Sequence, residues 1–441
     1  MASKIGALEL IRSTLNRIPS VAIMGKVTRV VGLVIEGDLP HVPVGASCVI
    51  LQENGEKLAA EVIGLKESKA ILMPIGNTAG VRVGDSIQTL SHEVTVKVSE
   101  KLLGRVLDGS GAPMDGGPDI SDAMEYPLYH PSVSPIHRKM VDKPFSVGIR
   151  AIDAFLTCGV GQRVAIMAGS GVGKSTLMGM MARNSDADIN VIGLLGERGR
   201  EVGEFLEDSL GKEGLKKSVV IIATSDSPAL LRMRAAFITT TIAEYFRDQG
   251  AKVLLMMDSL TRFAMASREV GLSLGEPPTV KGYTPSLFAA LPRLLERAGT
   301  TEGAGSITGF YTILTEGDDL QDPVADAVRS IVDGHIVLSR ELTTMGHYPP
   351  IDIIQSLSRV MPQVTTKEHQ NHLIQVRRLI ALYEEMKDYI RMGVYVPGRN
   401  AELDQAIAKR EMITHFLQQK RDDQGLMPET LARLQKIALE N

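Results

Sequence analysis

The sequence of 441 residues predicts an α/β core, preceded by an N-terminal β-barrel and followed by a C-terminal α-helical domain. Between residues 21 and 90, short β-branched runs are separated by turn signals, which is typical of a small barrel. Apolar strand-like runs then alternate with helical runs, which indicates a parallel sheet with helices on both faces. From about Thr366 onward, apolar residues recur at helical spacing. We therefore expect domains at residues 1–92, 93–362 and 363–441.

The first residues predict a short amphipathic helix that ends at Pro19, because a proline interrupts the helical hydrogen bonds. Its apolar positions are spaced by three or four residues and comprise Ile5, Leu8, Ile11, Leu15 and Ile18. Two interpretations stay open. The apolar face packs on the chain's own first domain, or it binds a partner.

The barrel region carries one strong hairpin signal and one informative absence. Asn54-Gly55 lies between the apolar runs Cys48–Leu51 and Leu58–Ile63, and this dipeptide favours a tight turn between paired strands. Residues 21–90 contain no Phe, Tyr or Trp. Barrels that bind single-stranded nucleic acid use aromatic side chains as stacking platforms. The absence of aromatic residues therefore favours an assembly module over an RNA-binding domain.

The composition gives no sign of a nucleic-acid-binding, secreted or membrane-spanning protein. The net charge of −4 offers no basic footprint for nucleic acid. Cys48 and Cys158 lie far apart in the sequence, and two free thiols in a reducing cytosol are the simplest account. No secretory signal is visible, and no apolar run approaches the roughly 20 residues that span a bilayer. We expect a cytoplasmic protein that meets a membrane peripherally or through a partner.

The core begins after a Gly/Pro-rich joint at residues 108–118. Its expected strands are apolar runs that end where helical patterns begin: Val164–Met167, Val191–Leu195, Val219–Ala223, Val253–Met257 and Ser306–Leu314. Because ligands of open α/β sheets bind beyond the carboxyl ends of the strands, chemistry is expected in the segments that follow these runs.

The first of these segments is the strongest motif in the chain. Ala168-Gly-Ser-Gly-Val-Gly-Lys-Ser175 follows an apolar strand and opens a helical run, which is the context of a phosphate-binding loop. It predicts a P-loop NTPase core. The general pattern has Gly where this chain has Ala168, but three glycines remain to close the loop. The candidate nucleotide-binding residues here are Ala168, Gly169, Ser170, Gly171, Val172, Gly173, Lys174, Ser175 and Thr176.

Two further strand ends carry carboxylates. Asp258 ends Val253–Met257 and can hold the shell of a Mg²⁺ ion whose other protein ligand is the Ser175 hydroxyl. Glu197 follows Val191–Leu195 and can polarise an attacking water, with Arg198 beside the γ-phosphate. A lone strand-terminal Asp is often only a cap, and an isolated Glu-Arg-Gly-Arg-Glu run is usually a solvated cluster. The phosphate loop in the same sheet makes the functional interpretation the stronger one.

Other polar residues are less specific. Arg262 lies four residues after Asp258 and can face the same site. Arg359 is either an arginine finger or an ordinary surface arginine, and its spacing does not decide between them. His369 and His372 share a helix face without a third ligand nearby, so we expect solvated histidines rather than a metal site.

Taken together, these motifs resemble the rotary-type ATPases, and most closely the flagellar protein-export ATPases. The matching segments cover nearly the whole chain and include Leu103–Gly109, Gly148–Asp153, the phosphate loop, Gly196–Glu201, Asp258–Phe263, Gly275–Pro285, Gly346–Asp352 and Ser356–Arg359. Ala168 is usual in this branch. The resemblance implies an ATPase that uses Mg²⁺, has the three parts predicted above and assembles as a homo-oligomeric ring of six.

The resemblance also implies roles for individual residues. Lys174 and Ser175 would contact the phosphates and Mg²⁺, Glu197 would be the catalytic carboxylate, and Asp258 would belong to the Mg²⁺ site. Arg198 and Arg262 would lie on the phosphate side, and Arg359 would reach into a neighbour's site. Tyr348 would stack on adenine, with Tyr395 as a second candidate.

The resemblance further implies the partners: export-apparatus regulator and stalk proteins, export substrates with their chaperones, and a membrane export gate at the inner membrane. No nucleic acid is expected among them. Three alternatives compete with this interpretation. Virulence-type secretion ATPases share the architecture. A non-hydrolysing subunit of a mixed ring would lack the carboxylate that Glu197 supplies. A nucleic-acid motor is disfavoured by the aromatic-free barrel and the acidic net charge.

Overall fold

The computed structural model describes residues 24–120, 122–315, 317, 319 and 321–440. The amphipathic helix expected before Pro19 lies outside these residues. Two compact units are present: residues 1–95 with 273–275, and residues 96–272 with 276–441. The domain boundaries expected at residues 92 and 362 remain a prediction.

The first unit contains a closed six-stranded barrel with the order β1-β2-β5-β4-β3-β6. Its strands are β1 (Met24–Val31), β2 (Val34–Asp38), β3 (Ser47–Leu51), β4 (Lys57–Lys66), β5 (Lys69–Pro74) and β6 (Ser86–Ser91). The expected hairpin is present, since β3 and β4 pair antiparallel from Leu51 opposite Lys57, and Gly55 adopts a φ of 83° in the turn. Aliphatic side chains such as Ile35, Ile50 and Ile87 fill the interior.

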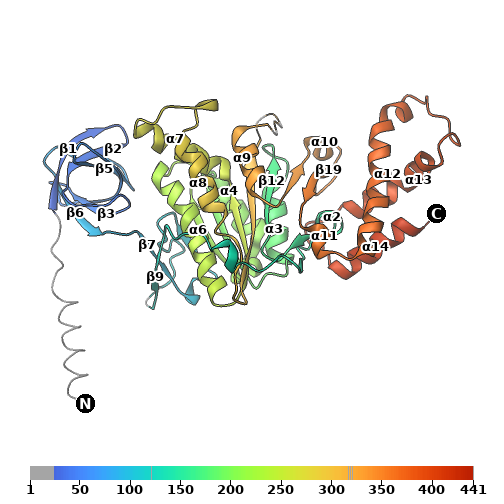
Figure 1. The fold of residues 1–441 in the computed structure, drawn as a ribbon, viewed down its shortest axis with the longest axis horizontal. Helices are drawn as coiled ribbons and strands as arrows, with labels where there is room; N and C mark the ends of the chain where they lie inside the picture. Colours follow the sequence, from blue (N-terminus) through green and yellow to red (C-terminus); the bar gives the residue numbers. More distant parts are fainter. Residues whose placement is uncertain (1–23, 121, 316, 318, 320, 441) are drawn as a thin grey trace, which may run out of the picture. The chain divides into compact units, whose positions relative to one another are not determined.

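The second unit is built on one large sheet with the order β19-β18-β12-β17-β15-β13-β14-β8. Figure 1 labels two strands of this sheet, β12 and β19. The strands are β8 (Val106–Asp108), β12 (Arg163–Ala168), β13 (Ile189–Leu195), β14 (Ser218–Ala223), β15 (Lys252–Asp258), β17 (Ser306–Leu314), β18 (Gly334–Leu338) and β19 (Ile351–Ser358). A ninth strand, β16 (Gly299–Thr300), pairs antiparallel with β17 outside this order. All five expected strands are found. The sheet is parallel from β18 to β8, while β19 joins the edge antiparallel.

Helices cover both faces of this sheet, as predicted. In β13, Ile192 and Leu194 join the same apolar core as Leu177 and Met178 of α3 (Lys174–Asn184). Gly193 points the other way, toward α6 (Ala229–Asp248), where an added Cβ would lie 2.7 Å from the Thr239 hydroxyl. Successive strand residues thus face opposite helical layers.

The C-terminal part is helical and comprises α12 (Lys367–Arg391), α13 (Ala401–Leu417) and α14 (Met427–Leu439). All three helices contact α2 (Arg150–Phe155), and their apolar faces continue the core that α3 forms with the sheet. Thr366 caps α12, because its hydroxyl accepts a hydrogen bond from the amide of His369. The expectation of solvated histidines is wrong for His369, which is buried and hydrogen-bonds through Nε2 to the Ala154 carbonyl at 2.8 Å.

Candidate functional site

The phosphate loop turns sharply between β12 and α3. Gly171 and Gly173 adopt φ angles of 78° and 94°, a backbone conformation that favours glycine. Gly173 is the residue before α3, and no side chain caps this helix end. The first amides of α3 are therefore available to an anion, and the helix dipole adds partial positive charge there.

A cavity of about 390 Å³ opens over the loop. Its lining brings together the loop residues, Glu197, Arg198 and Arg262, and it adds Glu201, Glu204, Asp208 and Arg421. Two predicted nucleotide-binding residues turn away from it: Ala168 is a buried strand residue whose carbonyl accepts a hydrogen bond from the amide of Thr315, and the Val172 side chain is in the apolar core.

Lys174 lies at the floor of this cavity between two carboxylates. Its ammonium donates a hydrogen bond to Asp258 Oδ1, and Glu197 Oε1 lies 3.6 Å from the same nitrogen. Asp258 Oδ1 also accepts a 2.7 Å hydrogen bond from the Thr312 hydroxyl. The three predicted groups therefore converge, although β17 separates the strand of the phosphate loop from the strand of Asp258.

Glu197 is the electrostatically perturbed carboxylate of the site. Burial and the nearby Asp258 raise its pKa to about 7, against the lowering effect of Lys174. Its Oε1 atom is buried without a hydrogen-bond partner, and the same holds for Arg262 Nε. Buried polar atoms normally have partners, so two such atoms beside one cavity point to a polar ligand. The Ser175 hydroxyl lines this cavity, and Asp258 reaches it through its contact with Lys174, so both could offer the hard oxygen ligands that Mg²⁺ prefers.

The two arginines differ in their surroundings. Arg198 is largely exposed and pairs with Glu201 at 3.6 Å. Arg262 packs its side chain against Gly196, where an added Cβ would lie 2.8 Å from Arg262 Cβ. Gly196 also has a φ of 68°, so only glycine fits between the strand end and this arginine.

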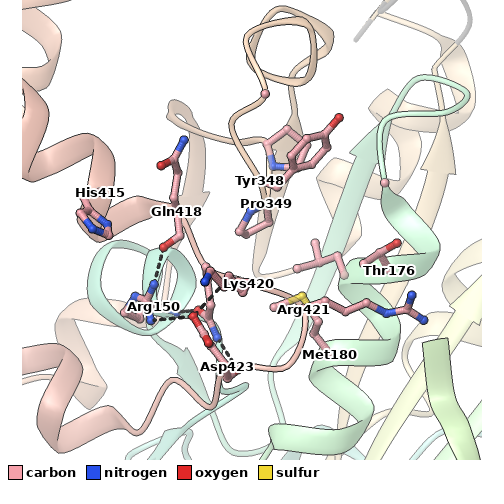
Figure 2. Close-up of a pocket in the computed structure, with 15 residues that line it drawn as sticks. Arg150, Thr176, Met180, Tyr348, Pro349, His415, Gln418, Lys420, Arg421 and Asp423 are labelled. Carbon is pink, nitrogen blue, oxygen red and sulfur yellow. Dashed lines mark hydrogen bonds and ion pairs between the residues drawn. The ribbon is translucent and has the colours of Figure 1, made fainter. Parts of the chain in front are cut away.

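A second cavity of about 530 Å³ adjoins the first and shares Gly173, Thr176 and Arg421 with it. Figure 2 shows Tyr348 and Pro349 on one side of this cavity, with Thr176 and Met180 of α3 on the other. The α13–α14 loop forms much of the remaining wall. The lining combines the apolar side chains of Leu177 and Met180, Tyr348 and two prolines with charged and amide side chains, and an aromatic ring beside apolar side chains suits a flat heterocycle.

Two candidates lie elsewhere. Arg359 follows β19 next to Asp333, which precedes the amino end of β18, and its guanidinium contacts the carbonyls of Val332 and Arg329. Arg359 therefore lies at the amino ends of the parallel strands, whereas Lys174 lies beyond their carboxyl ends. Tyr395 donates a hydrogen bond to Asp404 at 2.9 Å and is not among the residues that line the cavity of Tyr348.

Sequence reasoning missed several residues of the site. Thr312 had a sequence signal, because it is a threonine inside an otherwise apolar strand. Tyr311 pairs with Met257, so the next residues of the two strands, Thr312 and Asp258, lie beside each other. Arg150 and Arg421 left no such signal, since they reach the second cavity only through the docking of the α13–α14 loop.

Within the described residues, no helix is long and apolar enough to cross a membrane.

Family models match three parts of the chain. The nucleotide-binding domain of the ATP synthase alpha/beta family matches residues 148–358, and the beta-barrel domain of the same family matches residues 27–90. The C-terminal domain of the type III secretion ATPase EscN matches residues 365–436.

Individual relatives match along nearly their full length. The flagellum-specific ATP synthase of Bacillus subtilis is 48% identical over 94% of both chains. The type 3 secretion system ATPase of Xanthomonas euvesicatoria is 47% identical over 94% of this chain and 93% of its own. The assembled EscN of enteropathogenic E. coli superposes with a TM-score of 0.88 at 46% identity over 94% of this chain and 100% of its own. EscN has also been solved with its central stalk EscO, with a TM-score of 0.87 at 46% identity over the same shares.

Proposed function

This chain belongs to the ATP synthase alpha/beta family, in its branch of flagellar and type III secretion ATPases, and we propose that it works as a ring of identical subunits whose ATP hydrolysis energises flagellar protein export. The enzyme class follows from family membership. The assignments of residues, ring and partners below are our proposal.

One observation carries the assignment of the active site. The cavity of the phosphate loop holds Lys174 and Glu197, with Asp258 at its floor, and it joins the cavity of Tyr348 through Gly173 and Thr176. An adenine nucleotide has the same layout, with a polyphosphate at one end and a flat base at the other. The nucleotide would place its phosphates on the loop and its base against Tyr348, where stacking and buried area stabilise binding.

Each side chain then has a defined task. Lys174 and the loop amides neutralise and orient the β- and γ-phosphates. Glu197 Oε1 accepts a hydrogen bond from the attacking water and takes its proton as the water oxygen bonds to the γ-phosphorus, while the bond from that phosphorus to the β–γ bridging oxygen breaks and ADP leaves with the electron pair. Arg262, with a free Nε beside the same cavity, stabilises charge on the γ-phosphate together with Arg198. Ser175 and Asp258 would hold Mg²⁺, which supplies charge neutralisation at the transferring phosphoryl group.

Arg359 supports an assembled ring. Arg359 lies at the amino ends of the parallel strands and Lys174 lies beyond their carboxyl ends, so Arg359 cannot reach the site of its own subunit. It can complete only the site of a neighbour. Since one chain carries both Glu197 and Arg359, identical subunits suffice, and we propose a hexamer, in keeping with the assembled state of EscN.

The proposed partners follow from the same relatives. A stalk protein would occupy the ring as EscO does with EscN, and a regulator, export substrates with chaperones and a membrane export gate at the inner membrane would complete the apparatus. We propose the flagellar system over a virulence system, because three flagellum-specific relatives are 48% identical over 94% of this chain, whereas type 3 secretion system ATPases are 47% identical over 94% or 48% over 90%. Deletion of the gene in its own organism should then remove flagella rather than effector secretion.

The experiment that tests the proposed function is the dependence of Mg-ATPase activity on protein concentration. If a neighbour completes each site, single subunits should hydrolyse ATP very slowly. Activity per subunit should therefore rise as rings form and then level off. The rise should coincide with the change in mass seen by light scattering. Constant activity per subunit across the assembly transition would contradict the ring, and no ATP hydrolysis at any concentration would contradict the function.

The raised pKa of Glu197 predicts the pH dependence of turnover. Glu197 can accept a proton only as a carboxylate, so kcat/KM should rise with pH through about 7 and level off above it. Initial rates at low ATP concentration across this range measure the profile, and far-UV circular dichroism checks that the fold is retained at each pH. A flat profile between about pH 6 and 8 would mean that Glu197 does not act as the base.

A further inference from the structure

Arg421 occupies the junction of the two cavities. It is one of three residues that line both, together with Gly173 and Thr176 at the start of α3. Figure 2 shows its side chain running from the α13–α14 loop past Met180, on the side of α3 that carries Thr176. A C-terminal residue thus contributes a cation to the place where the phosphate end of the site meets the nucleobase end.

The backbone that carries this cation is held in place. Arg183 of α3 donates a 2.8 Å hydrogen bond to the Arg421 carbonyl. The buried amide of Gln419 donates to the Gly148 carbonyl and accepts from the Arg150 amide, both at 2.8 Å, while its own backbone amide donates to the Tyr348 carbonyl. The starting point of the Arg421 side chain is therefore fixed relative to the phosphate loop and to Tyr348.

The charges of the phosphate cavity leave two arginines without an acidic partner. Lys174 lies between Asp258 and Glu197, and Arg198 pairs with Glu201. Among the described residues, Arg262 and Arg421 form no ion pair with an Asp or Glu. Arg262 packs on Gly196 beside Glu197, which is the γ-phosphate end of the proposed pose. Arg421 is the corresponding cation at the other end of the polyphosphate.

We propose that Arg421 binds the α-phosphate of the nucleotide within the same subunit. This inference rests on the nucleotide pose of the proposed function and adds a contact to it. The contact would make nucleotide affinity depend on the α13–α14 loop, so that the C-terminal helical region shares directly in nucleotide binding.

The test compares nucleotides that differ in their phosphates. Affinities of ADP, AMP and adenosine are measured by competition against a fluorescent ADP, for the wild type and for Arg421→Ala and Arg421→Gln. Loss of a charge-assisted hydrogen bond should weaken ADP and AMP by about tenfold in both variants. Adenosine, which has no phosphate, should bind as it does to the wild type.

Lys420→Ala is the matched control, because Lys420 lines the nucleobase cavity and not the phosphate cavity. It should leave the ratio of ADP to adenosine affinity unchanged. Unaltered ADP and AMP affinity in the Arg421 variants, or a parallel loss of adenosine affinity, would overturn the inference while leaving the proposed function standing. Failure of the wild type to bind ADP, or an unchanged ADP affinity in Lys174→Ala, would instead overturn the proposed site itself.

Discussion

Glu197→Gln is expected to retain ATP binding and to lose turnover by a factor of about 10²–10⁴, the usual contribution of a general base. The amide has almost the same shape as the carboxylate, so the cavity keeps its form and Lys174 can still engage the phosphates. It cannot take up a proton, so the attacking water is no longer activated. Fluorescent-nucleotide binding and single-turnover hydrolysis separate these two effects.

Glu201→Gln provides the matched control, because Glu201 lines the same cavity four residues further along the chain and pairs with Arg198. It should reduce turnover far less than Glu197→Gln. Loss of ATP binding together with turnover in Glu197→Gln would show that Glu197 holds the site together instead of acting on water.

Mixing Arg359→Ala chains with Glu197→Gln chains is expected to restore ATPase activity that neither preparation has alone. A trans-acting arginine finger contributes about 10³–10⁵ in rate in related phosphoryl transfer, so each pure ring should be nearly silent. In mixed rings, an Arg359→Ala subunit keeps Glu197 and can receive Arg359 from a Glu197→Gln neighbour. Random equal mixing should complete roughly a quarter of the interfaces in this way.

A second mixture controls for unspecific rescue. Lys174 and Glu197 serve the site of their own subunit, where their side chains lie 3.6 Å apart. Mixing Lys174→Ala with Glu197→Gln therefore leaves every site with one defect, and activity should stay absent. If mixed rings of the first pair form and remain inactive, Arg359 does not act across the subunit boundary.

Much of the fold and the centre of the candidate site could be predicted because their signals are local. Asn54-Gly55 produces a hairpin since its backbone conformation suits a tight turn, and Ser306–Leu314 is a strand throughout its expected length. Lys174, Glu197 and Asp258 each follow an apolar run. In a parallel sheet the ends of such runs meet at one edge, and the structure brings these three side chains together there.

The remainder depends on contacts between residues that are far apart in the chain. Helical spacing predicted the face of His369 but not its burial, which comes from packing against Ala154, 215 residues away. The same holds for Arg421, which is an ordinary charged residue in its local sequence. Only the docking of its loop on α3 and on the turn at Gly148 brings it to the nucleotide cavity.

The sequence by itself therefore determined the elements of this protein and the chemistry of its phosphate end, because glycine conformations, strand ends and helix starts are set over a few neighbouring residues. The tertiary structure decided that β17 lies between the strand of the phosphate loop and the strand of Asp258, and that His369 is buried. It also decided at which end of the strands Arg359 lies and which loop closes the nucleobase cavity. Those outcomes are set by packing and by hydrogen bonds between segments separated by up to 271 residues, which leave no periodic mark in the sequence.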